Sequence, residues 1–167
     1  LDNAYVEFSG IDYLPLLKKY ENLVIGRTFS KVYSLAGLRI GYAFVPAWLQ
    51  PYYTRAGTPF TVNAVSAAAA AAALSDREHV ARCVTQVTAW RGRFAQELKY
   101  PVLPSDANFV MIDVAPHKSD DVVEKLAEKN VLVRSCRSFT GLADHYIRVS
   151  IGDTWENERL VRELNAL

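Results

Sequence analysis

The chain has 167 residues, half of them hydrophobic, which is enough to bury a core as one domain or as a domain with a smaller lobe. Its 19 basic and 18 acidic side chains leave a net charge near zero, which argues against binding to nucleic acid or to an anionic membrane. Cys83 and Cys136 belong to no CxxC pair or cysteine-histidine cluster. The sequence therefore predicts neither a disulfide framework nor a metal site, and a reducing, cytoplasmic setting fits best.

The ends and the most apolar stretch of the chain bear on processing and on membranes. Residues 64 to 74 are mostly alanine and reach only about half the length that a bilayer-spanning helix needs, so no membrane segment is expected. Leu1 is not a methionine, no signal-peptide pattern follows it, and the first residues have the pattern of a strand end. We therefore expect the chain to be a fragment of a longer protein.

Short helices and strands are predicted to alternate in the first sixty residues. The expected elements are an amphipathic helix over 11–20, a buried strand over 22–25, an irregular polar segment over 28–34, a strand over 38–45 and a short helix opened by Pro46. This order places Lys31 in a turn between two strands.

Two helices follow in the middle of the chain. Seven consecutive alanines, Ala67 to Ala73, combine the highest helix propensity with a small side chain and predict a helix from about Thr61. Ser75 is predicted to cap a second, longer helix, because Glu78 stands three residues later as in a capping box. This amphipathic helix should end near Lys99.

The last third again alternates strands with helices. The expected elements are a strand over 108–114, a helix over 119–129, a strand over 131–134, a strand over 146–151 and a closing helix over 155–167. Such alternation predicts an α/β or α+β fold. A change of character near residues 99 to 104 predicts a boundary between one domain over residues 1–100 and a second over residues 101–167.

The segment from Gly26 to Lys31 is the first candidate for chemistry. It places two small hydroxyl residues, Thr28 and Ser30, just before a lysine in a predicted turn. A lysine amine becomes a nucleophile toward carbonyl compounds when burial or nearby cations lower its pKa, and it then forms Schiff bases. Taken alone the pattern is weak, because most lysines in polar loops are solvated surface residues.

Two further groups strengthen this candidate. Arg39 is flanked by apolar residues and two glycines, and a buried guanidinium requires an anion, which either a phosphate group or an internal carboxylate would supply. Asp2 and Tyr5 stand at the predicted end of the first strand, where open α/β sheets place ligand-binding groups. An aspartate there would keep a pyridinium nitrogen protonated, whereas the plain alternatives are a turn residue for Asp2 and a core residue for Tyr5.

These residues carry a resemblance to a known family. The segments Asp2-Asn3-Ala4-Tyr5, Thr28-Phe29-Ser30-Lys31 and Ala36-Gly37-Leu38-Arg39-Ile40-Gly41-Tyr42 resemble three successive motifs of fold-type I pyridoxal-phosphate enzymes, in the family's order. The resemblance extends over essentially the whole chain and is closest to the histidinol-phosphate aminotransferases, within the class I and II aminotransferases. It implies the carboxyl-terminal part of the large cofactor-binding domain, followed by the smaller α+β domain. The upstream part that completes the cofactor site would then be missing.

The resemblance also implies roles for the cofactor-side residues. Lys31 would form the Schiff base with pyridoxal 5'-phosphate and, once freed by substrate, carry a proton between the substrate's alpha carbon and the cofactor. Thr28, Ser30 and Arg39 would grip the cofactor phosphate. Asp2 and Tyr5 would contact its ring.

The substrate-side residues implied by the resemblance are arginines near the end of the chain. Arg148 would bind the alpha-carboxylate of the amino acid, a task that suits a planar, bidentate donor. Arg134 would meet the phosphate end of the substrate, and the nearby Arg137 is an alternative for that role.

The resemblance implies transamination between histidinol phosphate and 2-oxoglutarate, with glutamate as the other amino acid, in histidine biosynthesis. It also implies a homodimer whose active site lies at the subunit interface. Aromatic amino acid aminotransferases and a threonine-phosphate decarboxylase share the scaffold and stay open as alternatives. So does a non-catalytic module that binds the cofactor or serves only as structure. The chain alone is expected to have little activity.

Overall fold

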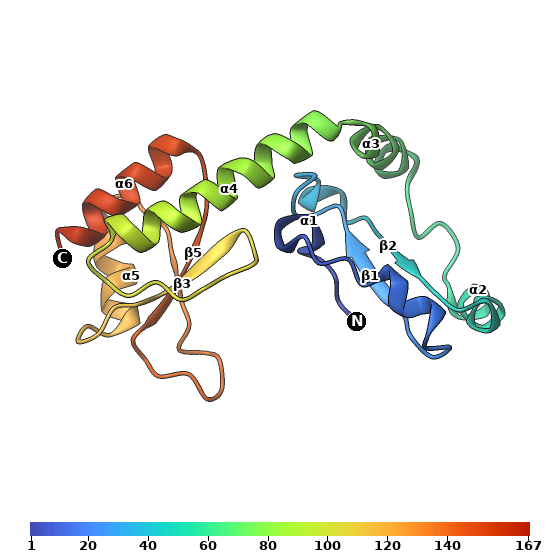
Figure 1. Cartoon of the computed structure of the whole chain (residues 1–167), viewed down its shortest axis with the longest axis horizontal. Helices are drawn as coiled ribbons and strands as arrows, with labels where there is room; N and C mark the ends of the chain where they lie inside the picture. The colour runs from blue at the N-terminus through green and yellow to red at the C-terminus, as the bar shows by residue number, and fades with distance from the viewer. The chain divides into compact units, whose positions relative to one another are not determined.

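The computed structural model describes residues 1–167, as a mixture of helices and short strands (Figure 1). Its contacts divide the chain into two compact units, Leu1–Val84 and Thr85–Leu167, and the division falls inside α4 (Arg77–Glu97). The predicted α/β class is confirmed. The domain boundary predicted at residue 100 stays a prediction.

The Leu1–Val84 unit is built around a two-stranded antiparallel sheet. Its elements are α1 (Val6–Ser9), η1 (Leu14–Lys18), β1 (Ile25–Thr28), η2 (Ala36–Leu38), β2 (Gly41–Phe44), η3 (Ala47–Leu49), α2 (Gln50–Ala56), α3 (Ala64–Ser75) and the start of α4. Thr28 pairs with Gly41 in the register of the two strands. A Cβ atom at Gly41 would lie 2.7 Å from the carbonyl oxygen of Arg27, so this pairing requires glycine.

Several boundaries in this unit differ from the prediction. The first strand begins at Ile25 instead of Asn22, and the strand predicted from Leu38 begins only at Gly41. Arg39 has a φ of 50°, a left-handed backbone that cannot continue a strand. The predicted helix over 11–20 is a shorter 3₁₀ helix with Pro15 in its first turn. Asp2 forms an isolated parallel bridge with Gly26 of β1, and the Asn3 N–H donates to the Gly26 carbonyl at 2.9 Å, so the first residues pair as the end of a strand, as predicted.

The caps of the two central helices also differ from the prediction. The Asn63 side chain accepts a hydrogen bond from the Ser66 backbone at 2.8 Å, so α3 begins at Ala64 and not near Thr61. Ser75 is still the last residue of α3 and does not cap α4. The Asp76 carboxylate accepts from the backbone N–H of His79 at 2.9 Å and takes that place. An anionic cap also interacts favourably with the positive end of the helix dipole.

The Thr85–Leu167 unit packs helices against a three-stranded antiparallel sheet of order β3-β5-β4. Its elements after α4 are β3 (Phe109–Asp113), α5 (Ser119–Glu128), β4 (Arg134–Ser135), β5 (Tyr146–Ser150) and α6 (Thr154–Asn165). Figure 1 shows α6 beside the end of α4, where the Asn165 side chain donates to the Glu97 carbonyl at 2.8 Å. These elements confirm the predicted order, and only β4 is displaced, from the predicted residues 131–134 to 134–135.

Alternation of side chains along the strands places the core of this unit. Val110 and Ile112 on β3 pair with Val149 and Ile147 on β5, and all four side chains are buried on the same face. Met111 pairs with Arg148 on the opposite face. Both cysteines are free, and none of the helices has the combination of length and apolar character that crossing a membrane requires.

Candidate functional site

A hollow of about 610 Å³ in the Leu1–Val84 unit gathers five of the six residues predicted to bind the cofactor. The five are Asp2, Thr28, Ser30, Lys31 and Arg39. The sixth, Tyr5, is not among the lining residues, but its ring centroid lies 5.3 Å from the Lys31 amine. The sequence motifs therefore meet in space, although the first and last of them are more than thirty residues apart in the chain.

Lys31 lies in the loop that follows β1, as predicted. Its side chain is half-buried, and the amine lies near the face of the Tyr5 ring, where a cation is favoured. No carboxylate lies within ion-pair distance of this amine, and no hydrogen bond holds it. The Lys31 amine is therefore available to react with a carbonyl group placed in the hollow.

Arg39 is exposed, which corrects the expectation of a buried guanidinium. It pairs with no carboxylate, so the internal ion pair considered from the sequence is not formed. Its Nη1 donates to the Ala36 carbonyl at 3.0 Å, which leaves further N–H donors for an anion. The left-handed backbone of Arg39 is unusual for a residue with a side chain and is a feature that clusters at ligand sites.

The other polar groups of the hollow are fixed by short-range hydrogen bonds. The Thr28 hydroxyl accepts from the Ser30 backbone at 3.0 Å, which brings the two hydroxyl residues together in a tight turn. The Asp2 carboxylate accepts from the Ala4 backbone at 2.9 Å. The bridge between Asp2 and Gly26 attaches this carboxylate to the start of β1, close in space to the Lys31 loop.

Arg27 also lines the hollow and was missed from the sequence. Its guanidinium is paired with Asp12 at 2.6 Å, so part of its charge is already neutralised. Nearby, burial raises the pKa of the Glu7 carboxyl, while the positive charge of Arg27 opposes this shift. Burial and the neighbouring Glu7 raise the pKa of Tyr33. Nothing in the local sequence of Arg27 distinguishes it from an ordinary strand residue.

The Thr85–Leu167 unit carries the two predicted substrate-side arginines. Arg134 on β4 and Arg148 on β5 are directly opposite each other in the strand register, and neither has a carboxylate partner. Arg134 lies over the Phe139 ring and Arg148 over the Phe109 ring, at 5.2 and 5.0 Å from the ring centroids. Like charges directly opposite each other on a sheet are unfavourable, so this pair is suited to an anion that neutralises both.

Arg137, the alternative to Arg134, is already engaged. Its guanidinium is bound to the Asp120 carboxylate at 2.7 Å. Burial raises the pKa of the Cys136 thiol, and Arg148 and Arg134 oppose this shift because they favour a thiolate nearby. The structure thus brings Arg134 and Arg148 together at one place and leaves Arg137 in a separate ion pair.

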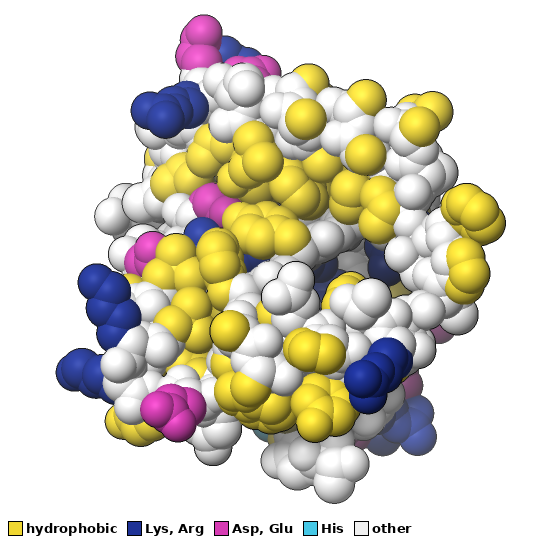
Figure 2. All heavy atoms as spheres, turned by 90° about the vertical axis from the view of Figure 1, so that its right-hand side faces the viewer, with side chains coloured by type: hydrophobic (Ala, Val, Ile, Leu, Met, Phe, Trp, Pro, Cys, Tyr) yellow, Lys and Arg dark blue, Asp and Glu magenta, His cyan; other side chains and the backbone are white.

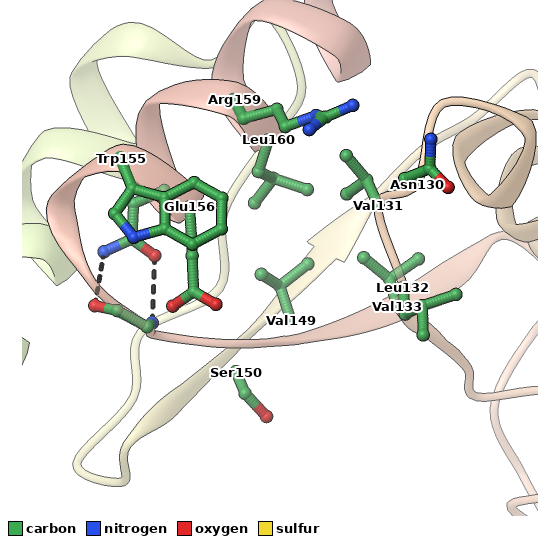
Figure 3. A pocket seen from close by; sticks show the side chains of 12 residues that line it. Asn130, Val131, Leu132, Val133, Val149, Ser150, Trp155, Glu156, Arg159 and Leu160 are labelled. Carbon is green, nitrogen blue, oxygen red and sulfur yellow. Dashed lines mark hydrogen bonds between the residues drawn. The ribbon is translucent and has the colours of Figure 1, made fainter.

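A second hollow, of about 350 Å³, lies between residues 130–133 and α6 (Figure 3). It contains none of the predicted site residues. Its charged groups already have partners: Glu156 accepts from the Asp153 backbone in a capping box, and Arg159 donates to the Lys129 carbonyl at 2.7 Å. The Asn157 amide exchanges two hydrogen bonds with Gly152, as the dashed lines in Figure 3 show. These contacts stabilise the end of the sheet.

The class of protein to which the chain belongs follows from comparison with known proteins. The family model for aminotransferase class I and II matches residues 1–164, so the chain belongs to this family.

Within the family, the chain is 62% identical to a histidinol-phosphate aminotransferase of Methanosphaerula palustris, over 100% of this chain and 48% of that protein. It is 60% identical to the enzyme of the same name from Methanoculleus marisnigri, over 100% of this chain and 47% of that protein. The chain thus spans about half the length of the curated relatives it matches.

Solved structures agree with this assignment. The histidinol-phosphate aminotransferase of Clostridium acetobutylicum has a TM-score of 0.90 at 25% identity, over 99% of this chain and 52% of that one. The same enzyme from Sinorhizobium meliloti, solved in complex with pyridoxal-5'-phosphate, has a TM-score of 0.88 at 28% identity, over 99% of this chain and 47% of that one.

Proposed function

We propose that this chain is part of a pyridoxal-phosphate-dependent aminotransferase that transfers an amino group between histidinol phosphate and 2-oxoglutarate, in histidine biosynthesis. The observation that carries the proposal is the shared hollow of the Lys31 amine, the Asp2 carboxylate and the Arg39 guanidinium. The names of the Methanosphaerula palustris and Sinorhizobium meliloti relatives support the reaction, and the ligand of the second supports the cofactor.

The donor set of the hollow fits this cofactor. An aldehyde needs an amine, a phosphate needs hydroxyl and guanidinium donors, and a protonated ring nitrogen needs a carboxylate, and the hollow offers all three. When bound, pyridoxal phosphate supplies an aldehyde that condenses with amines and a ring that withdraws electrons from the substrate's alpha carbon.

Each residue then has one task. Lys31 would hold the cofactor through its amine, and its Nζ would be the group that moves a proton at the substrate's alpha carbon. The carboxylate of Asp2 would stabilise the protonated form of the ring nitrogen. The hydroxyl groups of Thr28 and Ser30 and the guanidinium of Arg39 bind the phosphate, and the phenol of Tyr5 binds the ring oxygen.

The cross-strand arginines are proposed to bind the substrate. Arg148 binds the alpha-carboxylate of glutamate, because its half-buried guanidinium presents a planar pair of donors. Arg134 binds the phosphate end of histidinol phosphate. The absence of a carboxylate partner for either arginine supports these roles, because both keep their donors for a ligand.

A cytoplasmic homodimer is the proposed assembly. Figure 2 views the molecule from the side of α2 and α3 in Figure 1 and shows hydrophobic side chains gathered there. Phe60, Val65 and Tyr53 are 99%, 71% and 70% exposed. Apolar surface of this kind is normally covered by protein. Light scattering on the full-length protein should give twice the monomer mass, and a monomer would contradict the proposed assembly.

The proposed cofactor chemistry is tested on the full-length protein that contains this chain. Addition of pyridoxal phosphate should produce the visible absorbance band of a lysine-bound cofactor. Lys31→Ala should abolish that band, because no other lysine lines the hollow. Lys19→Ala, which removes an exposed lysine outside the hollow, is the matched control and should keep it. A band of equal intensity in Lys31→Ala would contradict the assignment.

The proposed reaction is tested by product analysis. Histidinol phosphate and 2-oxoglutarate should yield glutamate in proportion to the substrate consumed. Release of carbon dioxide from threonine phosphate, without an oxo product, would favour the decarboxylase alternative instead. The 167-residue chain alone should turn over histidinol phosphate far more slowly than the full-length protein, because its hollow is open and Arg39 and Asp2 are exposed.

A further inference from the structure

Two helix side chains hold the loop that carries Lys31 and Arg39. This loop, residues 29–40, connects β1 to β2 and is called here the connecting loop. One contact comes from His79 near the start of α4, and the other from Ser66 near the start of α3. Each contact is made to the backbone carbonyl next to one of the two proposed cofactor-binding residues. Neither His79 nor Ser66 lines the hollow.

The contact beside Lys31 is a hydrogen bond from His79. Its Nε2 lies 2.9 Å from the carbonyl oxygen of Val32, a residue that is only 1% exposed. A carbonyl oxygen only accepts hydrogen bonds, so Nε2 must carry a proton. The Cys83 sulfur lies 3.5 Å from the same nitrogen. His79 is itself held, because its backbone N–H donates to the Asp76 carboxylate.

The contact beside Arg39 is a hydrogen bond from Ser66. The Ser66 hydroxyl donates to the Leu38 carbonyl at 2.9 Å and accepts from the Asn63 amide at 2.9 Å, and the side chain is 1% exposed. Both functions of this hydroxyl are therefore used. Substitution of Ser66 by alanine would leave the Leu38 carbonyl without this partner in a partly buried position.

The backbone of the connecting loop requires such anchors. Ser34 and Arg39 have φ angles of 58° and 50°, which residues with side chains rarely adopt. Within the loop, the Ser34 N–H donates to the Lys31 carbonyl at 2.9 Å and the Leu35 N–H donates to the Phe29 carbonyl at 3.0 Å. Strained backbone persists only where surrounding contacts determine it, and His79 and Ser66 supply contacts from outside the loop.

We propose that His79 and Ser66 are positioning residues that fix the distance and direction between the Lys31 amine and the Arg39 guanidinium. The inference rests on the proposed function, since it assigns these two groups to the covalent link and to the phosphate. Both residues act through the backbone of the connecting loop, and neither touches the cofactor. Because His79 and Ser66 are far from Lys31 and Arg39 in the sequence, no local sequence motif predicts these roles.

The central experiment compares two variants of His79 in the full-length protein. His79→Phe keeps the ring volume and removes the donor, whereas His79→Gln keeps an N–H donor at a similar reach. We expect His79→Phe to speed hydrogen exchange of the Ser34 and Leu35 amides in the cofactor-free protein and to raise the dissociation constant for pyridoxal phosphate, each about five- to tenfold, since one hydrogen bond to a buried carbonyl is lost. His79→Gln should restore both to within about twofold.

The absorbance spectrum of the bound cofactor distinguishes a positioning role of His79 from a general contribution to stability. The pH at which the visible band of the bound cofactor changes should shift in His79→Phe and return in His79→Gln, because it depends on the placement of the Lys31 nitrogen. His117→Phe is the matched control, since His117 contacts Tyr100 in the other unit, and it should change none of these quantities. Ser66→Ala should mainly weaken cofactor binding through Arg39.

Three results would overturn the inference: unchanged loop exchange and cofactor affinity in His79→Phe, equal effects of phenylalanine and glutamine, or an unprotonated Nε2 in the side-chain ¹⁵N spectrum of His79 in the unsubstituted protein. The last measurement does not depend on the folding of any variant. Failure of the unsubstituted protein to bind pyridoxal phosphate would refute the proposed function, while the exchange and nitrogen measurements would still decide whether His79 anchors the loop.

Discussion

The two units of the chain have nearly equal lengths but bury very different amounts of apolar surface. The Leu1–Val84 unit has six buried hydrophobic residues and twelve exposed large ones. The Thr85–Leu167 unit has seventeen buried hydrophobic residues and four exposed large ones. The unit that carries the Lys31 hollow is therefore the one whose own residues cover its apolar side chains least.

The sheets explain this difference. Two antiparallel strands with short helices offer little area for side chains to pack on, and such hairpins are marginal by themselves. The three-stranded sheet of the second unit presents Ile112 and Ile147, both 0% exposed, to a layer of helices. We infer that the first unit depends on further polypeptide for its stability, whereas the second contains most of its own core.

We expect the largest difference in folding when the two units are produced as separate proteins. A protein of residues 85–167 should unfold cooperatively on heating, because its core side chains are supplied internally. A protein of residues 1–84 should lack a cooperative transition and bind a hydrophobic dye, because its exposed apolar side chains have no cover. Circular dichroism and dye fluorescence on the two proteins measure this. A sharp transition in residues 1–84 would remove the contrast between the units.

A matched pair of leucine substitutions tests the contrast at single residues. Leu126→Ala, at a position that is 0% exposed on α5, should lower the free energy of unfolding by about 3 kcal/mol through a lost side chain and a cavity. Leu74→Ala, at a position that is 52% exposed on α3, should change it by less than about 0.5 kcal/mol. Urea denaturation of the 167-residue chain measures both. Equal losses would mean that exposure does not distinguish the two sites.

Substitution at the cap of α4, the helix that spans both units, should have a smaller effect on the free energy of unfolding. Asp76→Ala should destabilise the protein by about 1 kcal/mol, because the His79 N–H at the start of α4 loses its acceptor. Ser75→Ala is the matched control and should be nearly neutral, since Ser75 lies at the end of α3. Denaturant midpoints compare the two variants, and a larger loss in Ser75→Ala would restore the cap assignment predicted from the sequence.

The smallest expected effect is a pH dependence in the Leu1–Val84 unit. Burial raises the pKa of Glu7 above its ordinary value of 4.5, so the folded chain binds the proton more tightly than the unfolded chain. The contribution of Glu7 to the free energy of unfolding is fully present below pH 4.5 and is lost as the pH rises through the pKa that Glu7 has in the folded chain. Glu7→Gln should therefore be more stable than the unsubstituted chain at neutral pH, and the difference should shrink toward pH 4.5.

The control for this prediction is Glu124→Gln, which removes an exposed carboxylate in the other unit. It should show no comparable dependence. Unfolding free energies of the three proteins at several pH values give the answer. A Glu7→Gln variant that is less stable than the unsubstituted chain at neutral pH would mean that attraction to Arg27, and not burial, dominates at this carboxyl.

The motifs of this chain could be read without coordinates because they are short and local. A lysine after two hydroxyl residues and an arginine between two glycines are visible over a few positions, and so is the alternation of strand residues in NFVMIDV. The order of elements in the second unit was predictable for the same reason, since periodic apolar patterns are local properties of the chain.

Boundaries and long-range contacts needed the tertiary structure. The strand predicted from Leu38 begins later because the backbone of Arg39 is left-handed, which its residue type does not indicate. Asp76, and not Ser75, caps α4, although both are residue types that cap helices. The position of Arg27 in the lining of the hollow and the ion pair of Arg137 with Asp120 both depend on contacts between residues that are distant in the sequence.

The sequence by itself determined the family and the class of fold and predicted which lysine is reactive, since these follow from residue identities at fixed local spacing. Only the tertiary structure decided that Asp2, Lys31 and Arg39 share one hollow, that Arg134 and Arg148 face each other across two strands, and that His79 reaches the loop from 47 residues away. The physical reason is that packing and hydrogen bonding depend on distance in space, which no local pattern encodes.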